Sequence, residues 1–147
     1  MRSGDAFDLH RFVSAQEPVW SDVVSELRDG RKRTHWMWFV FPQIEGLGRS
    51  PTAQHYGIGS IEEARAYLAH PVLGSRLDEA TALTLRHRER TLREIFGSPD
   101  DRKFVSSMTL FDTAMSELDT PFAQALAAWN GGERDEATSR LLRRASQ

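Results

Sequence analysis

The stretch SPDDRKFVSSMTLFDTAM, residues 98–115, carries the pattern that decides the fold class. A serine, a proline and two aspartates form a typical helix start, because proline tolerates the first turn and carboxylates suit the positive end of the helix dipole. Behind them Phe104, Met108, Phe111 and Met115 recur at intervals of four, three and four residues. This spacing places all four on one helix face. The stretch therefore predicts a helix whose apolar side belongs to the core.

Start and stop signals of the same kind recur along the rest of the chain. They are prolines suited to a first helical turn, capping residues and terminal glycines: Pro18, Gly30, Ser60 with Glu63, Pro71, Thr91 with Glu94, Gly97, Thr120-Pro121 and Asp135. Neither Asp29-Gly30 nor Asn130-Gly131 joins two alternating segments, as a hairpin turn would. The chain is therefore predicted to be all-α, with about eight helices in one compact domain over residues 1–147. We expect Phe104, Met108, Phe111, Phe122, Leu126 and Trp129 to share the core.

Two adjoining segments differ from this regular pattern. The apolar run from Trp36 to Phe41 has a length that suits either a buried helix or a strand. Its helical neighbours and the terminating Pro42 favour a helix. The segment from Glu45 to Gly59 holds four of the ten glycines and a proline, and so predicts one long irregular loop. Long loops inside helical domains are often functional.

Composition excludes several classes of protein. The chain has 147 residues, with 19 basic and 21 acidic side chains, and this acidic balance argues against nucleic-acid binding. Without cysteine there is no disulfide, thiol nucleophile or cysteine-ligated metal, and the five histidines show no metal-ligand spacing. We therefore expect no metal and no cofactor. No apolar stretch follows Met1–Asp5, and no run approaches the roughly 20 residues of a membrane span, so we expect a cytoplasmic protein.

Several strings, in order along the chain, resemble the bacterial DUF1810 family. They are HWMW at 35–38, FPQ at 41–43, GLGRS at 46–50, HPVLG at 70–74, FG at 96–97, DDRK at 100–103 and SSMTLF at 106–111. The resemblance runs from about Phe12 to Leu142. It implies a small all-helical fold and no established activity. Members of the family sometimes bear the label calpastatin, which this sequence gives no reason to adopt.

The aromatic run contains the first candidate site residues. His35 could act as a catalytic acid or base near neutral pH. Trp36 and Trp38 could wall a pocket and stack on a planar ligand, while Gln43 offers both a donor and an acceptor. The alternative is that the tryptophans belong to the core and that His35 is a hydrogen-bonded structural histidine.

Two further groups could contribute to a site. In the loop, glycine amides with Arg49 could hold an anion near Tyr56, although no Walker or dinucleotide pattern is present and the loop could be only a connector. On the helix after Pro99, Lys103 and Ser106 share a face and could form an anion site or an activated serine, with Asp101 as a catalytic acid or base. The alternative there is ordinary capping, ion pairing and close helix packing.

These residues lead to one hypothesis about function. We expect His35, Asp101 and Ser106 as catalytic candidates, and Trp36, Trp38, Gln43, Arg49, Tyr56 and Lys103 as ligand-binding candidates, around one cavity. Its ligand would be a small, planar anion such as a nucleotide, and hydrolysis is the reaction expected if the protein is an enzyme. The alternatives are a non-catalytic protein-interaction module and, third, an RNA-binding accessory protein. A concave site would favour the ligand, and a flat apolar patch would favour a protein partner.

Overall fold

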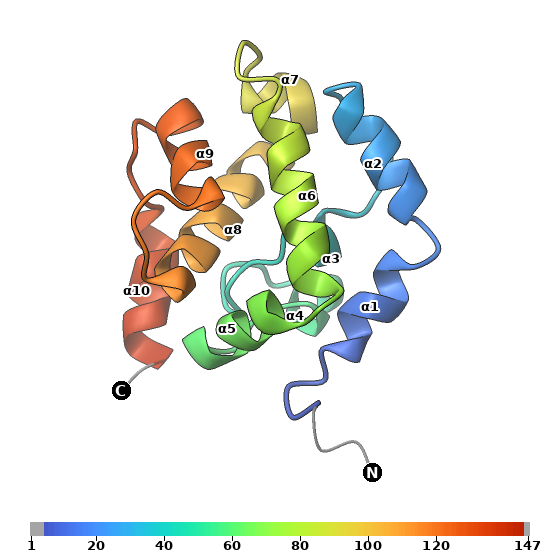
Figure 1. The fold of residues 1–147 in the computed structure, drawn as a ribbon. Helices are drawn as coiled ribbons and strands as arrows, with labels where there is room; N and C mark the ends of the chain where they lie inside the picture. The colour runs from blue at the N-terminus through green and yellow to red at the C-terminus, as the bar shows by residue number, and fades with distance from the viewer. Residues whose placement is uncertain (1–4, 146–147) are drawn as a thin grey trace.

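The computed structural model describes residues 5–145 and arranges them in helices, without a named strand in that range (Figure 1). The prediction of an all-α fold is thus confirmed. The helices are α1 (His10–Gln16), α2 (Trp20–Arg28), α3 (Met37–Val40), α4 (Pro51–His55), α5 (Ile61–Ala69), α6 (Leu73–Leu85), α7 (Leu92–Phe96), α8 (Asp100–Met115), α9 (Pro121–Trp129) and α10 (Glu136–Ala145). The apolar run forms the single turn α3, as its neighbours predicted. Of the helices described in residues 5–145, only α4 lies inside the loop predicted from Glu45 to Gly59.

Several helix starts follow the capping signals in the sequence. Thr91 and Glu94 form a complete capping box at α7, and the Thr120 hydroxyl accepts from the Ala123 amide at α9. At α5 only half of the expected box forms, because the Glu63 carboxylate accepts from the Gly59 amide instead. These local hydrogen bonds explain why short segments of ordinary composition become helical here.

The start of α8 differs from the prediction. Ser98 does not cap it, and the helix begins at Asp100 after Pro99 with no side-chain cap. The Asp101 amide donates instead to the Gly97 carbonyl at 2.8 Å. The backbone therefore satisfies a donor that the Ser98 hydroxyl was expected to satisfy.

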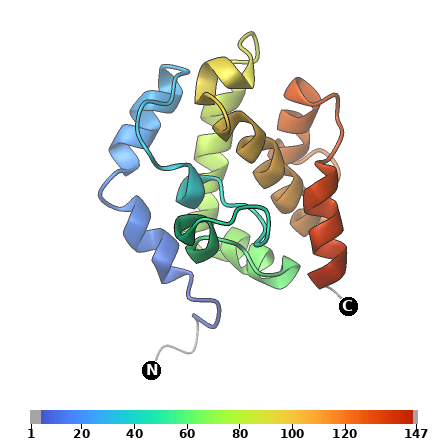
Figure 2. The same cartoon turned by 180° about the vertical axis from the view of Figure 1, so that it is seen from behind.

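The predicted apolar face of α8 lies in the centre of the molecule. Seen from behind, α8 crosses the middle with α10 beside it, and it also contacts α5, α7 and α9 (Figure 2). Phe104, Met108, Phe111, Phe122 and Leu126 are buried in one core cluster, as expected. Trp129 is only partly buried at the edge of this cluster, where its Nε1 donates to the Arg90 carbonyl at 2.8 Å.

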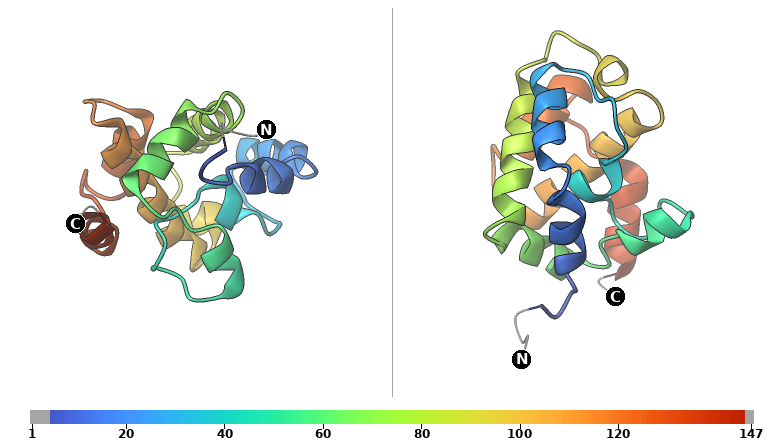
Figure 3. Two further views of the ribbon diagram at one scale, coloured as in Figure 1. Left: turned by 90° about the horizontal axis from the view of Figure 1, so that it is seen from below. Right: turned by 90° about the vertical axis from the view of Figure 1, so that its right-hand side faces the viewer.

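The glycine-rich segment leaves the core at Ile44 and returns to it at Ile58. These two residues form an isolated parallel bridge. The Glu45 amide donates to the Ile58 carbonyl at 2.8 Å, and the Ile58 amide donates to the Gln43 carbonyl at 2.9 Å. Gly57 permits this approach, because a Cβ there would lie 3.0 Å from the Glu45 Cα. Between the bridged residues, α4 projects from the body of the molecule (Figure 3, right).

None of the helices described in residues 5–145 is both long and apolar enough to cross a membrane.

Candidate functional site

An open cavity of about 460 Å³ lies between the aromatic run and α4. We call it the aromatic cavity, and its lining residues are His35, Trp38, Phe39, Pro51, Thr52, His55 and Tyr56. Three residues predicted from the sequence, His35, Trp38 and Tyr56, thus line one cavity although they come from two separate segments. His55, next to Tyr56, brings a second imidazole.

The walls of the aromatic cavity are held by contacts between rings. The Tyr56 ring lies 5.4 Å from the Phe39 ring and 5.8 Å from the Phe12 ring of α1, measured between centroids. The His55 ring stands edge-on to Tyr56 at 4.6 Å. Such tilted and edge-on contacts favour fixed ring positions over free rotation. Three of the lining rings, those of Phe39, His55 and Tyr56, are thus in contact with one another through Tyr56.

Arg11 on α1 fixes the end of α4, and the sequence analysis did not single it out. Its guanidinium donates to the His55 carbonyl at 2.8 Å, to the Gly57 carbonyl at 3.0 Å and to the Glu63 carboxylate at 2.8 Å. The side chains of Arg11 and Glu63 are 11% and 8% exposed, so this ion pair is largely shielded from water. Arg11 thereby joins α1, α4 and α5 beneath the cavity. No local pattern in the sequence predicts these long-range contacts.

The Glu26 carboxylate of α2 fixes the segment that carries His35. It is 5% exposed and accepts from the amides of residues 33 and 34, from the Thr34 hydroxyl and from Trp36 Nε1, at 2.7–3.0 Å. Burial raises the pKa of Glu26, but these hydrogen bonds outweigh burial and hold its pKa below the ordinary value. His35 lies exposed between two anchored residues, at the rim of the cavity.

Trp36 does not line the aromatic cavity. Its side chain is 1% exposed, its Nε1 donates to Glu26 at 2.9 Å, and its ring lies 6.3 Å from the Phe41 ring in the core. Trp36 is therefore a core residue, as the alternative interpretation expected of both tryptophans. Trp38, two residues later, is half-buried and faces the cavity.

Both lysines of the chain form ion pairs with the same carboxylate, that of Asp100 at the start of α8. Asp100 lies 2.9 Å from Lys32 Nζ and 3.5 Å from Lys103 Nζ. The Lys103 Nζ also lies 4.7 Å from the centroid of the Trp38 ring, within the range of a cation–π contact. The start of α8 thus contacts a wall residue of the aromatic cavity, although Lys103 itself does not line that cavity. Two ammonium groups on one carboxylate leave an excess of positive charge at this edge.

Gln43 and Arg49 lie outside the aromatic cavity. Gln43 lines a neighbouring recess of about 10 Å³ that shares Trp38 and Tyr56 with the cavity. A space of this size holds at most one water molecule. Arg49 is exposed and lines neither space, and its carbonyl accepts from Gln54 Nε2 at 3.1 Å.

The three residues expected to be catalytic do not meet. Ser106 is 7% exposed, and its hydroxyl contacts the Arg102 carbonyl at 3.2 Å and the Asp135 carboxylate at 3.3 Å. Asp101 lines a second cavity of about 630 Å³, away from His35. Ser106 therefore joins α8 to the start of α10 through Asp135, whose carboxylate also accepts from the amide and the hydroxyl of Thr138. Within residues 5–145, no group of three or more histidines and carboxylates could hold a metal.

The described residues 5–145 define an all-helical protein with open cavities on its surface. The chain belongs to the DUF1810 family, described as proteins of unknown function, and the model of that family matches residues 6–142. Its structure is similar to the crystal structure of the conserved hypothetical protein Rv1873 from Mycobacterium tuberculosis. The two share 56% sequence identity and a TM-score of 0.90 over 93% of this chain and 97% of that chain. None of the curated proteins matches the chain.

Proposed function

We propose that this protein binds a planar small molecule with an anionic group, of the nucleotide class, in the aromatic cavity. The observation that carries the proposal is the meeting of His35, Trp38 and Tyr56 around one open space of about 460 Å³. Small-molecule sites typically measure about 300–1,000 Å³ and combine apolar walls with a few polar groups. Here rings from two segments supply the walls, and two imidazoles with the Thr52 hydroxyl supply the polar groups.

The charges around the cavity favour an anion. The lysine pair on Asp100 leaves positive charge behind Trp38, and Lys103 lies directly against that ring. The imidazoles of His35 and His55 add hydrogen-bonding nitrogens at the lining. A flat ring system with a phosphate can therefore stack on the aromatic walls while its charge faces the imidazoles.

Binding is better supported than hydrolysis. His35, Asp101 and Ser106 do not share a cavity, so no nucleophile or water is held between an acid and a base. The proposal is therefore confined to recognition.

Thermal-shift titration with AMP tests the proposal, with uncharged adenosine as the comparison ligand. We expect AMP to raise the melting temperature of the wild type and adenosine to raise it less. His35→Ala should lose most of the AMP-induced rise while the ligand-free protein melts as before, because the side chain is exposed. His10→Ala is the matched control, since His10 is equally exposed and lies outside the cavity.

Lys103→Met provides a second variant, because it removes the charge against Trp38 and keeps the length of the side chain. It should weaken the response to AMP more than the response to adenosine. The proposal fails if AMP has no effect on the wild type. It also fails if His35→Ala keeps the full response, or if His10→Ala loses as much as His35→Ala.

A further inference from the structure

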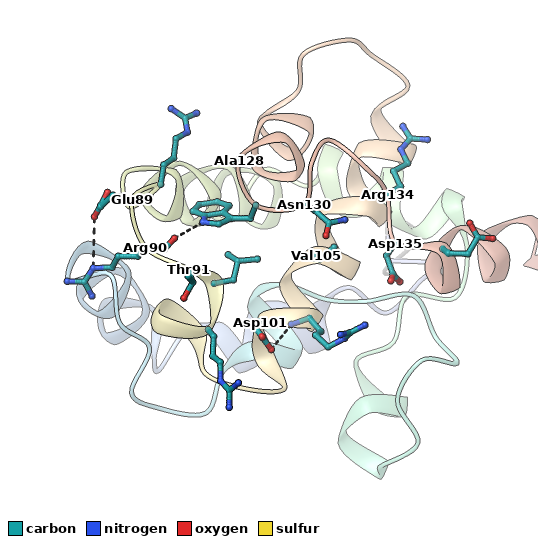
Figure 4. Close-up of a pocket in the computed structure, with 15 residues that line it drawn as sticks. Glu89, Arg90, Thr91, Asp101, Val105, Ala128, Asn130, Arg134 and Asp135 are labelled. Atoms are coloured by element: carbon teal, nitrogen blue, oxygen red, sulfur yellow. Dashed lines mark hydrogen bonds and ion pairs between the residues drawn. The ribbon is translucent and has the colours of Figure 1, made fainter.

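A second cavity, of about 630 Å³, opens between the α6–α7 connection, the first turns of α8 and the α9–α10 connection (Figure 4). We call it the arginine cavity. Its charged and ring-bearing lining residues are Arg88, Glu89, Arg90, Arg93, Asp101, Arg102, Trp129, Arg134, Asp135 and Glu136. Five arginines from three parts of the chain thus line one space, and none of them lines the aromatic cavity.

Three of these arginines make no side-chain hydrogen bond or ion pair with any residue in the range 5–145, namely Arg88, Arg93 and Arg102. The other two are engaged. Arg134 pairs with Asp112 at 2.9 Å, and Arg90 donates to the Gly30 carbonyl at 3.3 Å. An arginine side chain that lines the space without a carboxylate partner can turn toward an anion bound there and form charge-assisted hydrogen bonds with it.

The carboxylates of the cavity do not neutralise these three arginines. Asp135 accepts from Ser106 and Thr138, and Glu136 faces Arg140 and Arg143 of its own helix. Glu89 contacts Arg90 at 4.0 Å, and Asp101 accepts only from the adjacent amide of Arg102. The lining as a whole carries five guanidinium groups against four carboxylates, so its net formal charge is +1.

Trp129 gives the cavity a fixed flat surface. Its Nε1 donates to the Arg90 carbonyl at 2.8 Å, and its ring stands edge-on to Phe104 at 5.8 Å. Next to it, Asn130 uses its amide nitrogen on the Glu133 carbonyl at 2.7 Å, which leaves its side-chain oxygen as an acceptor at the lining. A ring, an acceptor and three free guanidinium groups are the features that recognise a base and its phosphates.

We infer that the arginine cavity binds a nucleoside polyphosphate, with the phosphates on Arg88, Arg93 and Arg102 and the base against Trp129. The size of the space suits one small molecule. The carboxylates of Glu89 and Glu136 also line it and would repel an extended polyanion that continued past the arginines. This site is separate from the aromatic cavity and does not depend on the function proposed there.

Calorimetric titration of the full chain with ATP, inorganic tripolyphosphate and adenosine tests the inference. We expect ATP to bind most tightly, tripolyphosphate to bind more weakly and adenosine to bind least, with ATP affinity falling as salt rises. Arg102→Gln and Arg93→Gln should each weaken ATP binding about tenfold, since each removes a charge-assisted contact. Arg31→Gln is the matched control, because Arg31 is exposed and lies outside the cavity.

His35→Ala should leave ATP affinity at the arginine cavity unchanged, which separates this inference from the proposed function. Absence of ATP binding at physiological salt would overturn it. Equal losses in Arg31→Gln and Arg102→Gln would also overturn it, because the effect would then be one of net charge. Tighter binding of a single-stranded oligonucleotide than of ATP would show that the surface serves a nucleic acid instead.

Discussion

Replacing Glu26 by alanine should lower the free energy of unfolding by about 3–5 kcal/mol. The carboxylate accepts four hydrogen bonds at 2.7–3.0 Å, and hydrogen bonds to a charged group each contribute roughly 1.5–3 kcal/mol. They are not additive, because they share one side chain and two of the donors can reach water when the segment moves. The indole of Trp36 is 1% exposed and would remain unpaired, at a cost of about 1–3 kcal/mol. A loss of this size is a large part of the free energy of unfolding of a typical domain, which is roughly 5–15 kcal/mol.

Glu26→Gln separates the contribution of the charge from that of the hydrogen bonds. Its amide oxygen can accept the three N–H donors, and its amide nitrogen can donate to the Thr34 hydroxyl, so only the charge is lost, at about 1 kcal/mol. Because the folded pKa of Glu26 lies below its ordinary value, the charge stabilises the fold above the unfolded pKa and ceases to do so as pH falls through the folded pKa. The stability of the wild type should therefore approach that of Glu26→Gln as the pH falls below the ordinary glutamate pKa of about 4.3.

Urea denaturation followed by the helical circular-dichroism signal measures both variants at neutral and acidic pH. If Glu26→Ala costs less than about 1 kcal/mol, or if Glu26→Gln is as unstable as Glu26→Ala, the carboxylate does not organise residues 33–36 as described.

Two further predictions test the packing. Phe111→Ala should cost about 3–5 kcal/mol in the same denaturation assay, because the ring is 0% exposed at the centre of α8; a loss under about 1 kcal/mol would contradict its place in the core. Gly74→Ala should cost about 1–3 kcal/mol, because the new Cβ would lie 2.2 Å from the Leu68 carbonyl oxygen, a backbone atom that cannot turn away. Gly59→Ala is its control and should stay within about 0.5 kcal/mol, since a Cβ there meets only side-chain atoms at 3.5 Å; equal losses at the two glycines would show that the α5–α6 corner is not tightly packed.

The helices could be predicted because their signals are local. The spacing of Phe104, Met108 and Phe111 fixes a helix face from a few neighbouring positions, and this face is buried as expected. The helix α4 carries the same kind of signal, since Ser50 caps it and Pro51 begins it, as Thr120 and Pro121 do for α9. The surrounding glycines concealed that signal.

The candidate site could be predicted only in part, because distant contacts decide it. Trp36 and Trp38 have the same side chain two positions apart, and only the carboxylate of Glu26 on another helix directs the first into the core. Ser106 and Lys103 lie three positions apart on α8, yet Asp135 on the α9–α10 connection engages Ser106. Periodicity fixes how side chains are spaced around a helix, but it does not fix which partner each side of the helix meets.

The bridge between Ile44 and Ile58 has a consequence for how this family can diversify. Because the chain leaves and re-enters the core at one point, everything between the bridged residues is a closed excursion that carries one wall of the aromatic cavity. Lengthening a closed excursion costs little, since doubling its length adds only about 0.6 kcal/mol of closure entropy. Insertions or exchanges at the tip near α4 can therefore reshape the cavity while the helices beneath keep their packing. Evolution, or an engineer, can thus change one wall of this cavity by replacing one short segment.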